Sequence, residues 1–273
     1  MNRRPAAAPP HAAHPSCAQA ALAEVLAAAG FVAAQEEAIE LTARAGGDAA
    51  LLEALVARRL AGEPLAWITA SAPFCGIAVR VDPGVYVPRW QSEPLVRRAI
   101  ERLGPDGTAV DLCTGSGAVA VALSARRPGA RVVASDLDER AVACALANEV
   151  EAYRGDLFAP LPKTLRGRVD LVVAVVPYVP TPSLALLPRD TLAFESPLSY
   201  DGGPDGTGVL RRVIRTAPRY LRSGGTVLLE LGGDQAHALE GELRRLGYTV
   251  VDSLADDDGD LRGIELRLEA RTG

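Results

Sequence analysis

From residue 108 to residue 269 the sequence alternates short apolar segments with amphipathic ones, and this alternation constrains the fold more than any other feature. Helical patterns of roughly ten to fifteen residues separate most of the apolar segments, which is typical of βαβ units. The segment 169–176 is apolar on both faces, as a central parallel strand is. The predicted strands are 108–113, 131–136, 150–155, 169–176, 225–231, 248–254 and 262–269.

This order of segments predicts an α/β fold with a mostly parallel sheet of seven strands and helices on both faces. A short Asp-rich link, residues 255–260, joins the last two strands. A link of this length is too short for a crossover helix, so these two strands should form an antiparallel hairpin.

The chain before residue 92 is organised differently. Residues 17–72 hold three short helical patterns that end at glycines, with Asp48 placed to cap the third. We interpret them as a helical domain that grips a substrate, with packing alone as the alternative role. Residues 73–91 alternate apolar and polar side chains around the turn Asp82-Pro83-Gly84, which indicates a β-hairpin linker. The main domain is then 92–273, and the Pro-rich residues 1–16 are predicted to be a disordered tail.

Composition excludes several classes of protein. No run approaches the ~20 apolar residues of a membrane-spanning helix. The net charge of −5 argues against binding to a nucleic-acid backbone. The four cysteines form no CxxC pair and have no metal-ligand spacing with the histidines, so no metal site is expected. A reduced, cytoplasmic protein is the expectation.

A glycine-rich segment, Asp-Leu-Cys-Thr-Gly-Ser-Gly at 111–117, lies where the first main-domain strand becomes a helix. Glycines there let a ligand approach the backbone, and the helix N-terminus offers free N–H groups. Asp136 follows Gly117 by nineteen residues, at the end of the next strand. An acid at that place typically accepts hydrogen bonds from ribose hydroxyls.

Two cofactors fit this segment, a dinucleotide such as NAD and S-adenosylmethionine. Asp111 would repel a pyrophosphate but attract the ammonium and sulfonium of S-adenosylmethionine, so the charge favours the methyl donor over an NAD-dependent oxidoreductase. After the third strand, Asp156 can accept from an adenine amino group while Leu157 covers the ring.

Six segments, in this order and spacing, resemble the protein-(glutamine-N5) methyltransferases that act on release factors, most of all their relatives of unassigned substrate. They are GEPLAWITASAPF (62–74), VPRWQSEPLV (87–96), DLCTGSG (111–117), GDLF (155–158), VVPY (175–178) and FESPLSYDGGPDG (194–206). The resemblance covers about residues 50–270. It implies a Rossmann-like class I methyltransferase domain that uses S-adenosylmethionine, behind a helical domain that helps to hold the substrate.

Charge and resemblance together give a set of candidate cofactor-binding residues: Asp111, Cys113, Thr114, Gly115, Ser116, Gly117, Asp136, Leu137, Asp156 and Leu157. On the substrate side, the resemblance points to Pro88 and Arg89 and to Glu195, although a structural role, such as capping a turn, is favoured for Glu195.

The sequence departs from the family at its signature Asn-Pro-Pro-Tyr, whose asparagine accepts a hydrogen bond from the target amide. Here the four catalytic positions are Val175, Val176, Pro177 and Tyr178. Valine has no acceptor, and transfer to a poorly nucleophilic amide depends on positioning. Loss of one oriented hydrogen bond at a reacting group costs ~2–4 kcal/mol by analogy with oxyanion holes.

Three interpretations of the acceptor stay open. The enzyme methylates glutamine of a release factor slowly through a backbone carbonyl near Val176, or it methylates a small metabolite, or it binds S-adenosylmethionine without turnover.

Overall fold

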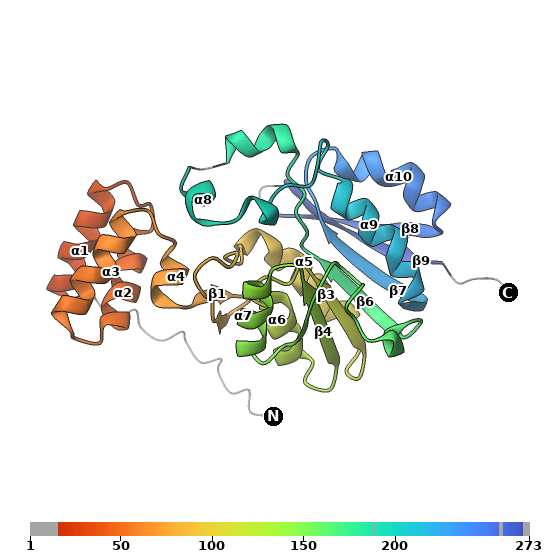
Figure 1. Ribbon diagram of the computed structural model, residues 1–273, viewed down its shortest axis with the longest axis horizontal. Helices are drawn as coiled ribbons and strands as arrows, with labels where there is room; N and C mark the ends of the chain where they lie inside the picture. The colour runs from red at the N-terminus through yellow and green to blue at the C-terminus, as the bar shows by residue number, and fades with distance from the viewer. Residues whose placement is uncertain (1–15, 188, 257–258, 270–273) are drawn as a thin grey trace, which may run out of the picture. The chain divides into compact units, whose positions relative to one another are not determined.

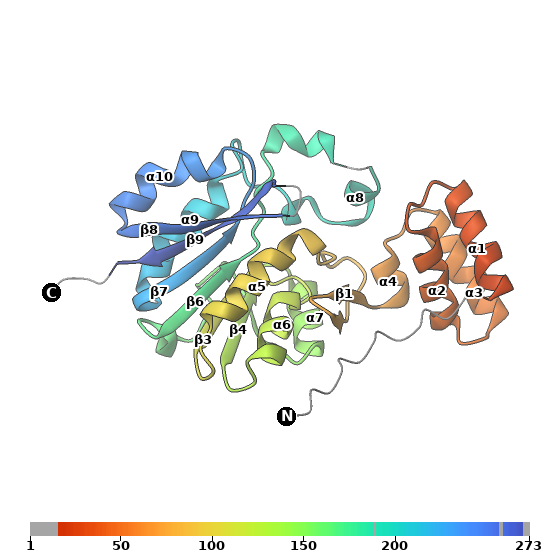
Figure 2. The same ribbon diagram turned by 180° about the vertical axis from the view of Figure 1, so that it is seen from behind.

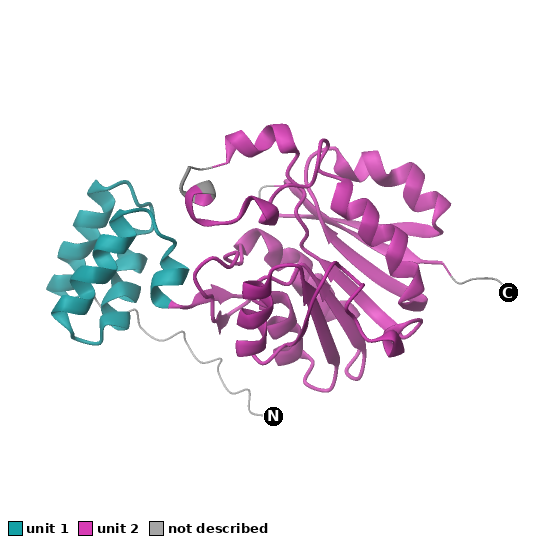
Figure 3. Ribbon diagram, in the orientation of Figure 1, with its two compact units in different colours: residues 1–69 teal, residues 70–273 magenta. Residues whose placement is uncertain are grey.

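The computed structural model describes residues 16–187, 189–256 and 259–269. The predicted tail 1–16 lies outside these residues apart from Ser16, which caps the first helix by accepting from Gln19 N. The chain divides into two compact units, residues 1–69 and 70–273 (Figure 3). Among the described helices, none is long and apolar enough to cross a membrane.

The first unit is helical, with α1 (Cys17–Ala28), α2 (Ala34–Ala45), α3 (Ala49–Leu60) and α4 (Leu65–Thr69). The Asp48 carboxylate accepts from Leu51 N at 3.0 Å and starts α3, as the sequence predicts. Leu26, Leu41, Leu55 and Ile68 are at most 3% exposed and form the centre of a small apolar core. One face of each helix is therefore already used for packing within this unit.

The second unit contains a sheet of seven strands in the order β5-β4-β3-β6-β7-β9-β8 (Figure 1). The strands are β3 (Thr108–Leu112), β4 (Arg131–Asp136), β5 (Glu151–Arg154), β6 (Val169–Ala174), β7 (Leu221–Glu230), β8 (Tyr248–Ala255) and β9 (Leu261–Leu268). Neighbouring pairs from β5 to β7 are parallel, and β9 runs antiparallel between β7 and β8. The predicted α/β fold and its terminal hairpin are confirmed.

Helices cover both faces of this sheet, as Figure 1 and Figure 2 show. One face carries α5 (Glu93–Arg102), α6 (Ala118–Arg126) and α7 (Glu139–Ala147), and the other carries α9 (Gly208–Thr216) and α10 (Gln235–Arg245). Successive residues of β6 enter the two cores in turn: Val173 packs on the α5 side, and Val172 on the α9 side. The segment 169–176 is thus apolar because both faces of its strand are buried, as the sequence predicts.

The remaining elements are short. They are β1 (Ala72–Phe74), β2 (Ile77–Val79), α8 (Arg189–Phe194) and the 3-10 turns Trp90–Ser92, Lys163–Leu165, Thr181–Leu186, Pro197–Ser199 and Ala217–Arg219.

The hairpin of residues 73–91 differs from the sequence prediction. Strands β1 and β2 turn at Cys75 and Gly76, whose φ angles of 50° and 75° are those of a two-residue hairpin turn. The Asp82-Pro83-Gly84 segment forms a separate turn, closed by Val85 N donating to Asp82 O at 3.1 Å. The prediction placed the hairpin at the wrong turn because Cys-Gly lacks the Asn-Gly or Asp-Gly signature.

The direction of the chain reverses at β3. It moves outward through β4 and β5, then returns to β6 on the other side of β3. In open α/β sheets, ligands bind outside the carboxyl ends of the strands at such a reversal.

A buried ion pair on β9 provides a test of this packing. Glu265 is fully buried, 2.6 Å from Arg98 Nη1 and 2.7 Å from Arg102 Nε of α5. Glu265→Ala removes the buried carboxylate that both arginines share at a helix–sheet contact, so we expect the free energy of unfolding to fall by about 3 kcal/mol. Urea unfolding followed by circular dichroism measures this.

Glu101 is the matched control, because it pairs with the same Arg98 at 3.2 Å but is 68% exposed. Glu101→Ala should change the unfolding free energy by less than about 0.5 kcal/mol. Equal effects of the two substitutions would contradict a packing role for Glu265.

Candidate active site

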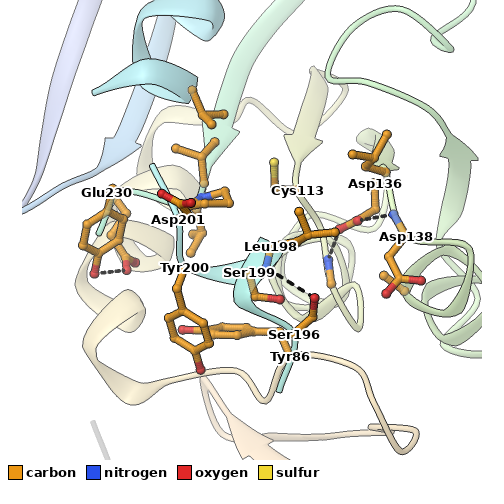
Figure 4. A pocket seen from close by; sticks show the side chains of 18 of the residues that line it. Tyr86, Cys113, Asp136, Asp138, Ser196, Leu198, Ser199, Tyr200, Asp201 and Glu230 are labelled. Atoms are coloured by element: carbon orange, nitrogen blue, oxygen red, sulfur yellow. Dashed lines mark hydrogen bonds between the residues drawn. The ribbon is translucent and has the colours of Figure 1, made fainter. Parts of the chain in front are cut away.

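A cavity of about 750 Å³ lies at the carboxyl ends of β3 to β7, entirely within the second unit (Figure 4). Its wall comes from the loop before α5, the loop after β3, the ends of β4 and β6, Leu187, Thr191 and residues of the segment 196–201. The volume is that of a site for a cofactor-sized molecule. Eleven of the seventeen residues predicted for the site line it: Arg89, Cys113, Gly115, Asp136, Leu137, Asp156, Leu157, Val175, Val176, Pro177 and Tyr178.

The loop after β3 presents its backbone to the cavity. Cys113 and Gly115 have φ angles of 58° and 56°, and both line the wall. A side chain at Gly115 would point toward Tyr86, whose Cβ would lie 3.9 Å from it. The loop therefore offers a ligand main-chain surface, as the glycines predict.

Four predicted residues of this loop region support it from below rather than line the cavity. The Thr114 hydroxyl donates to Asp111 Oδ2 at 2.5 Å, and both residues are buried. Gly117 has a φ of 83° and packs on α7: an added Cβ would lie 3.2 Å from Ala145 Cβ. Ser116 is 2% exposed.

The position of Asp111 corrects the charge argument made from the sequence. Its side chain is bonded to the loop, is 1% exposed and does not line the cavity. Burial raises the pKa of this carboxyl to about 7, although the hydrogen bond from Thr114 acts in the opposite direction. The acid shapes the loop instead of touching a ligand.

Asp136 lies on the opposite side of the loop and faces the cavity. Its Oδ2 accepts from Gly115 N and its Oδ1 from Asp138 N, both at 2.9 Å. Each carboxylate oxygen can accept a second hydrogen bond, so two hydroxyl groups of a ribose fit its remaining capacity. Burial raises the pKa of Asp136, and the two backbone donors lower it. Leu137 beside it is 61% exposed and offers an apolar surface.

The end of β5 supplies the far wall. Leu157 has a φ of 48°, and its carbonyl accepts from the Ser135 hydroxyl at 2.6 Å, which holds the side chain over the cavity. Asp156 is paired with Arg212 of α9. An adenine amino group would therefore share this carboxylate with an arginine, a contact that the sequence does not indicate.

The four residues after β6 line the other half of the cavity. Val176 is 2% exposed in the core on the α9 side, whereas Val175 is partly buried against the core on the α5 side. The Tyr178 hydroxyl donates to Glu230 Oε1 at 3.0 Å. Its backbone carbonyl accepts from Gln235 Nε2 at 2.6 Å.

The segment 194–206 folds closely around Tyr178. Val179 N donates to Tyr200 O, and Gly202 N donates to Val179 O, both at 2.8 Å. A Cβ at Gly206 would lie 2.2 Å from Tyr178 O, so a side chain is excluded there. Tyr178 is thus held both at its main chain and at its side-chain hydroxyl.

A buried carboxylate connects this segment to the loop before α5. Glu195 is 3% exposed, with Oε2 2.6 Å from Arg89 Nη2 and Oε1 accepting from Val87 N at 3.0 Å. The Tyr200 hydroxyl donates to the same carboxylate. Of the three predicted substrate-side residues, Arg89 lines the cavity, while Pro88 and Glu195 do not.

The sequence analysis missed further residues at the site, and three of them bear on its chemistry. Asn148 donates to Ser116 O at 2.8 Å and so holds the glycine-rich loop. Glu230 and Arg212 line the cavity. Glu230 ends a strand, as Asp136 does, and this shared position was the signal that could have found it.

Similar proteins were found by sequence. The chain is 36% identical over 211 residues to the release factor glutamine methyltransferase of Geobacter sulfurreducens, covering 75% of this chain and 73% of the relative. It is 36% identical over 230 residues to the one of Cereibacter sphaeroides, covering 81% of each. No protein-family model matches the chain.

A solved methyltransferase from Pyrococcus furiosus shares the fold, with a TM-score of 0.52 and 18% identity over 78% of this chain and 97% of that one.

Asp136 can be tested by cofactor binding. If its carboxylate holds two ribose hydroxyls, Asp136→Ala should weaken S-adenosylhomocysteine binding at least tenfold, since each charge-assisted bond contributes about 1.5–3 kcal/mol. Isothermal titration calorimetry measures the change. Asp138→Ala is the control, because the Asp138 carboxylate pairs with Arg140. This substitution should leave the affinity for S-adenosylhomocysteine close to that of the parent. Equal affinities for the Asp136 variant and the parent would rule out the assignment.

The raised pKa of Asp111 should make the free energy of unfolding depend on pH. Its pKa of about 7 in the folded protein exceeds the value of 3.8 for the unfolded chain, so the folded state binds more protons between these values. Its contribution to stability is therefore full below about pH 4 and is lost as the pH rises to 7. The unfolding free energy of the parent relative to Asp111→Asn should fall over that range.

Urea unfolding of both proteins at pH 5 and pH 7.5 measures this difference. Parallel pH dependences would show that the Asp111 carboxyl ionises as it does in the unfolded chain.

Proposed function

Because the chain belongs to the family of release factor glutamine methyltransferases, we propose that it methylates the side-chain amide of a glutamine in a release factor. It is a methyltransferase that depends on S-adenosylmethionine, and its fold is that of the class I enzymes. None of the relatives described above is an oxidoreductase, so the dinucleotide alternative has no support from them.

One observation carries the proposal. The residues suited to the donor, Asp136 and Leu157, and those suited to the acceptor, Val175 to Tyr178, line a single cavity. A methyl group can move between two molecules only if both reach the same space, and the strand order provides that space.

The cofactor fits the wall that it would occupy. S-adenosylmethionine supplies an electrophilic methyl group on a sulfonium, whose sulfur becomes a neutral thioether when the methyl leaves. Asp136 would accept from the ribose hydroxyls, Leu137 and Leu157 would cover the adenine, and the Cys113–Gly115 backbone would approach the amino-acid part. Asp156 would accept from the adenine amino group beside its arginine partner.

On the acceptor side, the chain positions an amide nitrogen. The N–CH₃ bond forms as the S–CH₃ bond of the donor breaks, and the nitrogen releases one proton to solvent. The nitrogen must therefore face the donor with its lone pair. We assign this orientation to the Tyr178 ring, which its hydrogen bond to Glu230 holds, and to a backbone carbonyl near Val176. Arg89 and Glu195 support the wall next to them. We also propose that the helical unit helps to hold the protein substrate and that the protein acts in the cytoplasm.

Val175 favours a second candidate. Because valine cannot accept a hydrogen bond, a small metabolite whose nucleophile needs no such acceptor also fits the cavity. A cofactor-binding protein without turnover is the third interpretation.

Restoring the family's asparagine tests the acceptor. Val175→Asn supplies the missing hydrogen-bond acceptor, worth about 2–4 kcal/mol at a reacting group, so transfer to a Gly-Gly-Gln release factor should rise at least tenfold. Labelled-methyl transfer measures the rate.

Val179→Asn is the matched control, since residue 179 also lines the cavity but lies beyond Tyr178. It should give no increase. Equal activity of Val175→Asn and the parent would show that the acceptor does not need the asparagine.

A further inference from the structure

Glu230 is a buried carboxylate at the site with one oxygen unused. It ends β7, is 4% exposed and lines the cavity. Oε1 accepts from Tyr178, whereas Oε2 has no hydrogen-bond partner within the part of the chain that the structure describes. Buried polar atoms without partners are rare in native proteins, so the unused oxygen points to a ligand.

The strand register places this carboxylate next to the altered signature. Parallel pairing of β6 with β7 ends at Ala174 opposite Leu229, so the next position sets Val175 beside Glu230. Neighbouring strands lie ~4.8 Å apart, and residues at one register position point to the same face. Glu230 therefore projects from the position beside the side chain that lacks an acceptor.

The surroundings of Glu230 leave its acceptor capacity available. Arg262 also lines the cavity, but its Nε lies 2.6 Å from Asp256 Oδ2, so that carboxylate already occupies it. Burial raises the pKa of Glu230, while the hydroxyls of Ser92 and Tyr178 and the positive charge of Arg262 lower it. Figure 4 shows Glu230 on the opposite side of the pocket from Asp136. It is thus separated from the predicted ribose site.

We propose that Glu230 Oε2 accepts a hydrogen bond from one hydrogen of the NH₂ group of the methyl acceptor, while the other hydrogen, which the family's asparagine would bind, has no side-chain acceptor at Val175. The proposal rests on the proposed function, because it names the group that orients the amide. Tyr178 donates to Oε1 and thereby turns Oε2 toward the acceptor. The carboxylate selects nucleophiles that carry a hydrogen-bond donor, such as an amide N–H, and disfavours acceptors that present an oxygen without hydrogen or a bare carbon.

Glu230→Gln tests this at nearly constant size. With Tyr178 donating to the remaining oxygen, the new NH₂ takes the place of Oε2 and faces the donor hydrogens of the amide. Methyl transfer to a Gly-Gly-Gln release factor should fall at least tenfold in kcat/KM, while S-adenosylhomocysteine affinity stays within twofold. Glu230→Leu, which has no acceptor in either orientation, should lose as much.

Two comparisons separate this role from a structural one. In the Val175→Asn background, the asparagine supplies the acceptor, so Glu230→Gln should cost threefold or less there. Glu265→Gln alters a buried carboxylate on the neighbouring strand β9, outside the cavity, and should leave the KM for the release factor unchanged.

Each outcome decides the question. Equal losses in the two backgrounds, no loss in either variant, or a parallel loss of S-adenosylhomocysteine affinity in both would overturn the role of Glu230 and leave the proposed function standing. If neither the parent nor Val175→Asn methylates the release factor, the proposed function fails and the role of Glu230 fails with it.

Discussion

The carboxyl ends of parallel strands lie along one edge of a sheet, and the site depends on this constraint. Because the chain reverses direction at β3, the loops after β3 and β4 diverge from the loop after β6 and leave a space between them. Residues far apart in sequence, such as Asp136 and Tyr178, then line one cavity. The residues of each half of the site lie near one another in the sequence. Only the strand order brings the two halves together around one cavity.

Within that space, the groups suited to ligand contact are held by hydrogen bonds that their own loops provide. Thr114 bonds to Asp111 beneath the glycine-rich loop, Asn148 holds the carbonyl of Ser116, and Tyr178 is held at both its hydroxyl and its carbonyl. The polar atoms below the wall are satisfied internally, so the wall can be rigid before any ligand arrives. Gln91 Oε1 and Glu230 Oε2, both on residues that line the cavity, depart from this arrangement.

Much of the fold could be predicted because the central strands are apolar on both faces and most strands are separated by helix-length segments. The glycine-rich loop and Asp136 could be placed at the site for the same reason, since each follows a strand directly. Side-chain direction could not be predicted. Asp111 occupies the expected place, yet its carboxylate turns into the protein. Glu230 escaped notice because its relation to Val175 depends on the β6–β7 register, which no local pattern encodes.

Adjacent residues after β6 rest on different sides of the sheet. Val175 packs toward α5 and α6, while Val176 joins the core of α9 and α10 together with Leu157. A change of residue at 175 is therefore absorbed on a face remote from the packing beneath Leu157. A substitution at residue 175 can therefore alter the acceptor half of the cavity while the packing of the cofactor half stays as it is.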